Sequence, residues 1–226
     1  TPEYAFHTNY GYHLDAGKFA ELLRKHCVGK LGVTHLKANV VSVKSSADGD
    51  IASLKTDSHG DISGDLFVDC SGSRALLLGE HFGVPFCSKG QFLFNDTALA
   101  SQIPYVNDDD PIASSTLSTA QTAGWIWDIG LPTRRGIGHV YSSGHTTEDR
   151  AAQELLAYIS ATVSPEAAAS ASIRKVPFSP GHRAKFWHKN CVAVGMSAGF
   201  IEPLEASALV LVELSAAMIA EQLPAN

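Results

Sequence analysis

The sequence predicts an α/β fold with an inserted antiparallel β-sheet, and three patterns in the chain support this prediction. Both ends of the chain alternate strand patterns with helix patterns, which is typical of a sheet covered by helices. The middle of the chain is richer in strand patterns bounded by turn residues. The clearest single pattern lies at residues 190–223, where an apolar strand runs into a turn of small residues that opens a long apolar helix.

The N-terminal part is predicted to contain a helix and several short strands. Asp15 suits the N-cap of a helix over residues 16–28, because its carboxylate can accept hydrogen bonds from the first helical amides. Gly29 and Gly32 are expected to end this helix. Its inner side is expected to carry the apolar residues Phe19, Ala20, Leu22, Leu23 and Cys27. Strands are expected at residues 33–36, 40–43, 51–56 and 62–70, followed by a helical turn at 75–78.

The middle and C-terminal parts complete the predicted architecture. A second, antiparallel sheet is expected from strands at residues 93–100, 124–131 and 138–143. A helix at 147–160 and a strand at 171–178 should follow. We therefore divide the chain into residues 1–80, which belong to the α/β domain, 81–180, which form the β-sheet layer, and 181–226, which return a strand and a helix to the first domain.

Composition excludes some classes of function. The 226 residues are 45% hydrophobic and carry a formal net charge of −6, which disfavours a nucleic-acid or anionic-membrane partner. The four cysteines show no CxxC spacing, and the ten histidines show no paired ligand spacing. We expect reduced thiols in a cytoplasmic protein, no bound metal and no membrane partner. The four cysteines are Cys27, Cys70, Cys87 and Cys191.

The turn after the strand at 191–194 has the properties of a ligand-binding turn. Its glycines and other small residues leave backbone amides uncovered, so that another molecule can approach closely. Pro203 suits the first turn of the following helix, and a helix N-terminus favours anions and electron-rich ligands. The turn therefore indicates a cofactor. We expect it to lie beside the turn at Gly72, because ligands of open α/β sheets bind at the carboxyl ends of strands.

A pyrophosphate-binding GxGxxG motif does not occur in this chain. Dinucleotide-binding folds carry that motif in their first βαβ unit. Either the fold does not bind a dinucleotide, or the first unit lies upstream of Thr1. The other motifs favour the second explanation.

Five segments occur in an order and spacing that resemble one family. They are Tyr12–Ala16, His59–Gly72, Gly124–Ile129, Gly138–Ser143 and Asn190–Glu205. Together they resemble the flavin-dependent tryptophan halogenases, a branch of the flavin monooxygenase-like enzymes. The combination of Trp-x-Trp-x-Ile with Gly-Phe-Ile-Glu-Pro-Leu-Glu is specific to that branch, and the resemblance covers nearly the whole chain.

The resemblance implies a fragment of a FAD-binding, flavin monooxygenase-like fold. In that family reduced FAD, supplied by a separate flavin reductase, uses dioxygen to oxidise a chloride or bromide ion. The oxidised halide then travels through a tunnel to an aromatic substrate such as tryptophan or another indole. The GxGxxG unit and the lysine that guides the oxidised halide are expected upstream, so that the fragment alone should be inactive.

The resemblance also assigns roles to residues of this chain. Glu205 corresponds to the catalytic glutamate near the substrate, and the halide is expected at Ser207 and Ala208. Trp125 and Trp127 are expected to line the tunnel, between the inserted sheet and the helix that begins near Glu205. Their spacing of two along a strand puts both indoles on one face. The residues expected to contact FAD are Val40, Gly195, Met196, Ser197, Ala198 and Gly199.

Two departures from the family pattern keep alternatives open. Ala206, Ser207 and Ala208 stand where Ser-Thr-Gly is usual, and Gly130 stands where the family has proline. A flavoprotein aromatic hydroxylase, or a halogenase-like flavin-binding protein without halogenation activity, is therefore the alternative. Without the family comparison, Glu205 is a carboxylate that stabilises a helix N-terminus, and the two tryptophans are core residues. Asp69 is either a polar contact to the flavin or a strand-end carboxylate.

Overall fold

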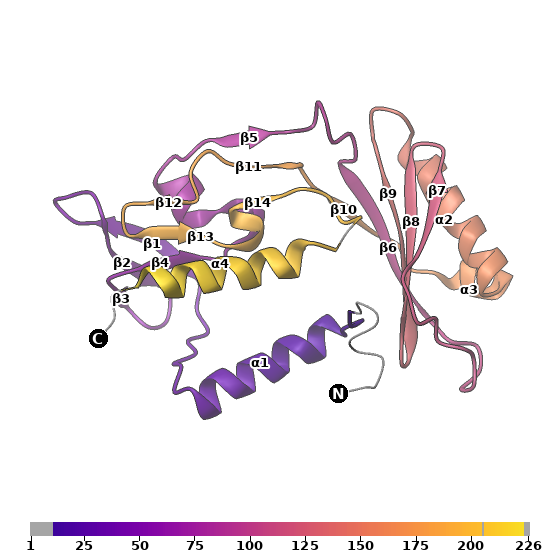
Figure 1. Ribbon diagram of the computed structural model, residues 1–226, viewed down its shortest axis with the longest axis horizontal. Coiled ribbons are helices and arrows are strands. Elements are labelled where there is room, and N and C mark those ends of the chain that lie inside the picture. The colour runs from indigo at the N-terminus through magenta and orange to yellow at the C-terminus, as the bar shows by residue number, and fades with distance from the viewer. Residues whose placement is uncertain (1–10, 205, 224–226) are drawn as a thin grey trace. The chain divides into compact units, whose positions relative to one another are not determined.

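A computed structural model of the chain describes residues 11–204 and 206–223, and these form two compact units (Figure 1). The first unit contains residues up to 35 and residues 97–177, whereas the second contains residues 36–96 and the chain from 178 onward. Helices and strands are mixed in both, which confirms the α/β class. Within the described ranges, no helix has both the length and the apolar character that a membrane span requires.

The first unit is built on a five-stranded antiparallel sheet with helices on one face (Figure 1). The order of its strands is β10–β6–β9–β8–β7. The strands are β6 Thr97–Pro104, β7 Leu117–Gln121, β8 Gly124–Leu131, β9 Arg134–Tyr141 and β10 Arg174–Pro177. The helices on this face are α2 Glu148–Thr162 and α3 Pro165–Ser170. The predicted inserted sheet is therefore present, although β6 begins at Thr97 rather than at residue 93.

The core of this unit lies between the sheet and α2. Ala151, Leu155 and Ile159 follow each other at a spacing of four and are fully buried, so they form one stripe of the helix. They pack on Ile126 of β8 and Ile137 of β9. Because side chains alternate along a strand, the neighbouring residues of β8 and β9 point to the opposite face of the sheet.

Buried polar groups fix the position of α2 on the sheet. Asp128 is buried and pairs with the guanidinium of Arg135, whose Nε lies 3.1 Å from Asp128 Oδ1. The hydroxyl of Tyr158 on α2 donates to Asp128 Oδ2 at 3.1 Å. His139 is also buried, and its Nδ1 lies 3.0 Å from the carbonyl oxygen of Ala151. Buried charges are tolerated only when they are paired, so these contacts specify one register of the helix.

Helix α1, Ala16–Lys30, begins at the predicted cap and is joined to the five-stranded sheet through its N-terminus. Asp15 Oδ1 accepts hydrogen bonds from the amides of Gly17 and Lys18, at 3.1 and 3.3 Å, and Asp15 Oδ2 binds Arg134 Nη1 at 2.9 Å. The hydrogen bond from Arg134 holds the pKa of Asp15 below its usual value.

The predicted inner side of α1 is wrong for the part of the chain that the structure describes. None of its residues is buried, and Leu22 is 62% exposed. The apolar surface of this helix is left uncovered by the described residues.

The second unit contains three small sheets and helix α4. The first sheet is β1 Val40–Ser45, β2 Ile51–Thr56 and β3 Asp61–Ser63. The second is β12 Trp187–His188, β13 Cys191–Ala193 and β4 Phe67–Asp69. The third is β14 Gly199–Phe200, β11 Gly181–Arg183 and β5 Phe86–Ser88. The helical segments are Gly72–Arg74 (η2), the π-helical Leu76–His81 (η3), Gly195–Ser197 (η4) and α4 Ala208–Gln222.

Two strand predictions for this unit need correction. Residues 33–36 form no strand, and the predicted strand at 62–70 is divided into β3 and β4 by the bend at residues 64–66. Division is required because β3 pairs with β2, whereas β4 pairs with β13 of another sheet. One straight strand cannot hydrogen-bond in both sheets with the same residues.

The side chain of Asn190 joins two of these sheets. Its Oδ1 accepts a hydrogen bond from the amide of Ile51, and its Nδ2 donates to the carbonyl of Ile51, both at 2.9 Å. Its backbone carbonyl accepts from the amide of Phe67 at 2.9 Å. The Asn190 side chain therefore makes the two hydrogen bonds with Ile51 that a neighbouring strand would otherwise make. Its backbone carbonyl begins the pairing of β13 with β4.

We predict that Asn190→Ala lowers the free energy of unfolding of the full-length protein by about 1–3 kcal/mol, because both backbone groups of a buried residue lose their partner. Urea unfolding followed by circular dichroism measures this difference. Asn107→Ala is the matched control, since the Asn107 side chain is exposed and bonds only Asp110 within its own turn. Equal stability of both variants would contradict the role assigned to Asn190.

Candidate functional site

The carboxyl ends of β4 and β13 lie side by side, and each is followed by a turn that opens with glycine. These are the strands that pair in parallel, with Ala193 opposite Asp69, and the amide of Val194 donates to the carbonyl of Asp69 at 3.0 Å. Gly72 opens η2 with φ +73°, and Gly195 opens η4 with φ +67°. Only glycine adopts this left-handed conformation without strain. The prediction that the two turns are neighbours at one sheet edge is confirmed.

Asp69 holds this edge together from inside. Its side chain is 2% exposed. Oδ1 accepts from the amide of Ser71 at 3.1 Å and from the hydroxyl of Ser71 at 2.6 Å. Oδ2 accepts from the amides of Leu77 and Leu78, at 2.9 and 2.8 Å. With both oxygens occupied, the carboxylate orders the turn and the π-helix behind it, so the interpretation as a strand-end carboxylate is the one that the geometry supports.

Ser197 plays a similar part in the second turn. It is buried, and its hydroxyl donates to the carbonyl oxygens of Asp69 and, at 2.7 Å, Val194. The side chain is therefore turned inward, so that this residue offers a ligand its backbone and not its hydroxyl. Met196 is 46% exposed and faces outward from the same turn.

Arg183 supports the turn from β11, a role that no pattern in the sequence indicates. Its amide donates to the carbonyl of Ala198 at 2.7 Å, and its Nη1 donates to the carbonyl of Val84 at 3.1 Å. The guanidinium lies so close to Gly79 that a Cβ there would be 2.8 Å from Arg183 Cζ. A lone arginine in a strand pattern carries no signal of this role, since the contact joins residues that are far apart in the chain.

The geometry of the edge fits a ligand that approaches the backbone closely. A Cβ built on Gly72 meets nothing within 4 Å, so the space beside this turn is open. The first amides of a helical turn have no partner within it, which leaves the amides at the start of η4 free of intrahelical bonds. Two adjacent turns of this kind favour an anionic or electron-rich group.

Val40, the other predicted cofactor contact, lies at a different place in the second unit. It is the first residue of β1 and is half-buried, with Thr56 of β2 opposite. The structure thus brings Gly195, Met196, Ser197, Ala198 and Gly199 together in one turn, and it places Val40 in another sheet.

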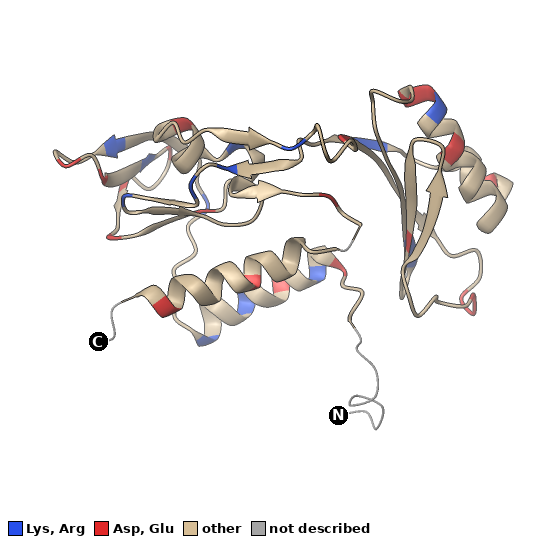
Figure 2. Cartoon of the chain, turned by 45° about the horizontal axis from the view of Figure 1, so that its top comes forward, with Lys and Arg blue, Asp and Glu red and all other residues tan. Residues whose placement is uncertain are grey.

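Helix α4 begins later than the sequence predicts. Ala206 has φ +49°, a left-handed conformation that interrupts the helix, so α4 begins at Ala208 rather than at residue 204. Ser207 stands at the N-cap but its hydroxyl makes no capping hydrogen bond. That hydroxyl and the amide of Ala208 are thus available at a helix N-terminus. The charged residues of α4 are Glu213 and Glu221, and Figure 2 colours all Asp and Glu residues of the described chain red.

Glu205, the predicted catalytic residue, lies outside the described residues. The segment just before it is anchored by Glu202. Its Oε2 accepts from Asn95 Nδ2 at 3.0 Å, and its Oε1 accepts from the amide of Leu204 at 2.9 Å.

Trp125 and Trp127 lie on the face of the five-stranded sheet that is opposite to α2. Both are half-buried, and their ring centroids are 6.2 Å apart with an interplanar angle of 62°. The Nε1 atom of Trp125 is buried without a hydrogen-bond partner among the described residues. The shared face is as predicted, while a location between this sheet and the helix near Glu205 stays a prediction.

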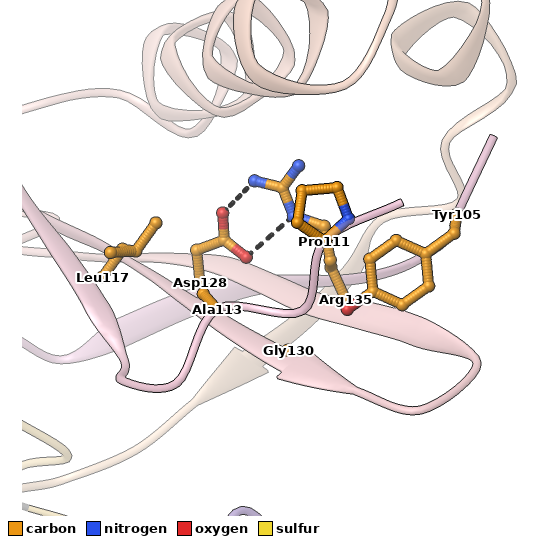
Figure 3. Close-up of a pocket in the computed structure, with 7 residues that line it drawn as sticks. All are labelled: Tyr105, Pro111, Ala113, Leu117, Asp128, Gly130 and Arg135. Carbon is orange, nitrogen blue, oxygen red and sulfur yellow. Dashed lines mark hydrogen bonds and ion pairs between the residues drawn. The ribbon is translucent and has the colours of Figure 1, made fainter. Parts of the chain in front are cut away.

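A separate cavity of about 170 Å³ lies on the face of the five-stranded sheet that α2 covers, beside Asp128 and Arg135 (Figure 3). Asp128 and Arg135 form its polar wall. Gly130, the departure from the family's proline, has a structural reason here. A Cβ on Gly130 would be 2.9 Å from Ile112 Cγ2 and 3.3 Å from the Ala113 backbone, so glycine lets this segment lie on the strand. The lining residues are Tyr105, Pro111, Ala113, Leu117, Asp128, Gly130 and Arg135.

Comparison with known proteins identifies the family. The family model for tryptophan halogenase matches residues 2–226. The chain belongs to the tryptophan halogenase family. It is 38% identical over 217 residues to the tryptophan 6-halogenase SttH of Streptomyces toxytricini and 36% identical over 217 residues to the tryptophan 7-halogenase RebH of Lentzea aerocolonigenes.

Solved structures of halogenases agree with this assignment. A tryptophan halogenase from Shewanella frigidimarina superposes with a TM-score of 0.93 at 54% identity, covering 100% of this chain and 43% of that one. BrvH, a flavin-dependent halogenase from Brevundimonas, gives a TM-score of 0.86 at 39% identity, covering 94% and 42%. The alignments span 96% of this chain but only 40% of SttH and of RebH. It therefore spans about two fifths of the halogenase relatives that it matches.

The electrostatics of the site lead to a prediction of pH dependence at Cys191, in β13. Burial, followed by the nearby charge of Asp69, raises the pKa of the Cys191 thiol from 9.0 to about 12. Because an unfolded chain ionises this thiol at lower pH than the folded one, the contribution of Cys191 to stability is complete below pH 9 and is lost as the pH rises toward 12.

We therefore expect the Cys191→Ala variant to lose less stability than the parent when the pH of urea unfolding is raised from 9 to 11. At pH 8, Cys191 should resist a thiol reagent until the protein unfolds. Rapid labelling of Cys191 in the folded protein, read by peptide mass spectrometry, would contradict the burial of this thiol.

Proposed function

We propose that the full-length protein to which this chain contributes is a flavin-dependent halogenase acting on tryptophan or another indole-like aromatic. The observation that carries the proposal is the pair of glycine turns at the ends of β4 and β13, in a chain matched along residues 2–226 by the tryptophan halogenase model. The names of SttH and RebH, both tryptophan halogenases, support the substrate class. Chloride or bromide is the second substrate.

The cofactor proposed for this edge is FAD, reduced by a separate flavin reductase. When bound, FAD supplies the oxidising power of dioxygen that converts a halide ion into an electrophile. The turn from Gly195 to Gly199 would hold the cofactor through backbone groups, because the hydroxyl of Ser197 is already hydrogen-bonded to backbone carbonyls of the protein. Ser207 and Ala208 would offer the halide a hydroxyl and an amide at the N-terminus of α4, where a negative charge is stabilised.

The two tryptophans and Glu205 complete the proposed arrangement. Trp125 and Trp127 present a wide apolar surface beside an indole N–H with no partner among the described residues, which suits the wall of a tunnel that excludes water. Glu205 would act at the substrate, where it accepts the proton that the aromatic ring loses. We also propose a cytoplasmic location, since the four cysteines of the described part are free thiols.

The direct test is the Glu205→Gln variant of the full-length protein. We expect it to reduce halogenation by roughly 10²–10⁴-fold, the usual cost of removing a positioned acid–base group. FAD binding and the reoxidation of reduced FAD should stay near the parental values, because the carboxylate acts only at the substrate. The assay combines product formation from tryptophan and indole, with chloride and bromide, and stopped-flow reoxidation kinetics.

Glu221→Gln is the matched control, because Glu221 is an exposed carboxylate near the other end of α4. It should halogenate like the parent. If the Glu205 variant also halogenates at the parental rate, Glu205 only stabilises a helix end. Flavin oxidation that yields hydroxylated instead of halogenated product would favour the aromatic hydroxylase.

A further inference from the structure

Strand β9 carries two glycines on the face of the sheet that holds the tryptophans. Gly138 is paired with Trp127 of β8, and Gly136 is paired with Ile129. Residues directly opposite each other in an antiparallel pair point to the same face. Both glycines therefore lie on the face of the sheet that also carries Trp125, Trp127 and Ile129.

The indole of Trp127 lies on the backbone of Gly138. A Cβ at Gly138 would be 2.1 Å from Cζ2 of Trp127, 2.3 Å from Cη2 and 2.6 Å from Cε2. Atoms in ordinary contact are about 3.5–4.0 Å apart, so any other residue would push the benzo ring about 1.5 Å away. A Cβ at Gly136, by contrast, would meet only the Ile129 carbonyl oxygen, at 4.0 Å.

Strand β9, on which the Trp127 ring lies, is held in place from its other face. Ile137 and His139, on either side of Gly138, are both buried against α2, and His139 is held there by its contact with the Ala151 carbonyl oxygen. The neighbours in the row of Trp127 are small, namely Ser118 on β7 and Ala100 on β6. A side chain added at position 138 must therefore move the indole, and with it the edge contact that the Trp127 ring makes with Trp125 at a centroid distance of 6.2 Å.

We propose that Gly138 is a positioning residue that sets the place of the Trp127 indole, and through it the yield of halogenated product. This inference rests on the proposed halogenase function. Displacing the ring opens or blocks a path that must carry the oxidised halide and exclude water. The consequence is fewer molecules of halogenated product for each FAD that is reoxidised.

The experiment compares Gly138→Ala with Gly136→Ala in the full-length protein. These substitutions add the same methyl group, on the same strand and the same face, but only the first meets an indole. We expect Gly138→Ala to lower the product formed per reoxidised FAD on the order of 10- to 10²-fold, as small displacements near the reacting groups do. Gly136→Ala should match the parent. The rate of FAD reoxidation should be the same in all three.

Circular dichroism supplies a readout that does not depend on activity. The Trp125 and Trp127 rings are close enough for their transitions to couple, so the coupled band reports their mutual orientation. Gly138→Ala should change this band, whereas Gly136→Ala should not. In the Trp127→Leu background, which lacks the benzo ring, adding Gly138→Ala should change neither the band nor the product yield further.

Each outcome decides the proposal. A Gly138→Ala variant that keeps the parental band or the parental yield overturns it. If Gly138→Ala does not fold, the double variant with Trp127→Leu should fold again, and its failure to fold would also overturn the role of the indole contact. A parent that reoxidises reduced FAD without halogenating any substrate overturns the proposed function itself, while the band still shows whether Gly138 places the ring.

Discussion

The buried carboxylate of Asp69 is the interaction on which the candidate cofactor edge depends. It accepts hydrogen bonds from the amides of Leu77, Leu78 and Ser71. The backbone carbonyl of the same residue accepts from the amide of Val194 and the hydroxyl of Ser197. A buried charge must be fully hydrogen-bonded, so these groups have one low-energy arrangement. The turns that open at Gly72 and Gly195 follow from that arrangement. Burial, and after it the nearby charge of Asp69, raises the pKa of the Cys191 thiol.

The five-stranded sheet shows a comparable division between support and function. On the α2 face, Asp128, Arg135 and His139 lock the helix by paired polar contacts. On the other face, the Trp127 indole lies directly on the backbone of Gly138. Because β9 is packed against α2 on its other side, a single methyl group at Gly138 is expected to move Trp127 and not the strand.

Local patterns in the sequence predicted much of this arrangement. The cap at Asp15, the turns at Gly72 and Gly195 and the alternation of Trp125 and Trp127 depend on near neighbours, and all were found as expected. Contacts between distant segments were not predictable. The inward hydroxyl of Ser197, the support from Arg183 and the close approach at Gly138 depend on which strands pair, and no local pattern encodes that. The roles of Glu205, Ser207 and Ala208 came from the family resemblance and stay predictions.

The central claim is that the Gly195–Gly199 turn, beside Gly72, is where the cofactor binds. A crystal structure of the full-length protein with FAD tests it most directly. The account predicts that FAD contacts the backbone of this turn, with the Ser197 hydroxyl still directed at Asp69 and the Gly72 side of the edge covered by the cofactor. FAD bound elsewhere, with this turn open to solvent, would contradict the account.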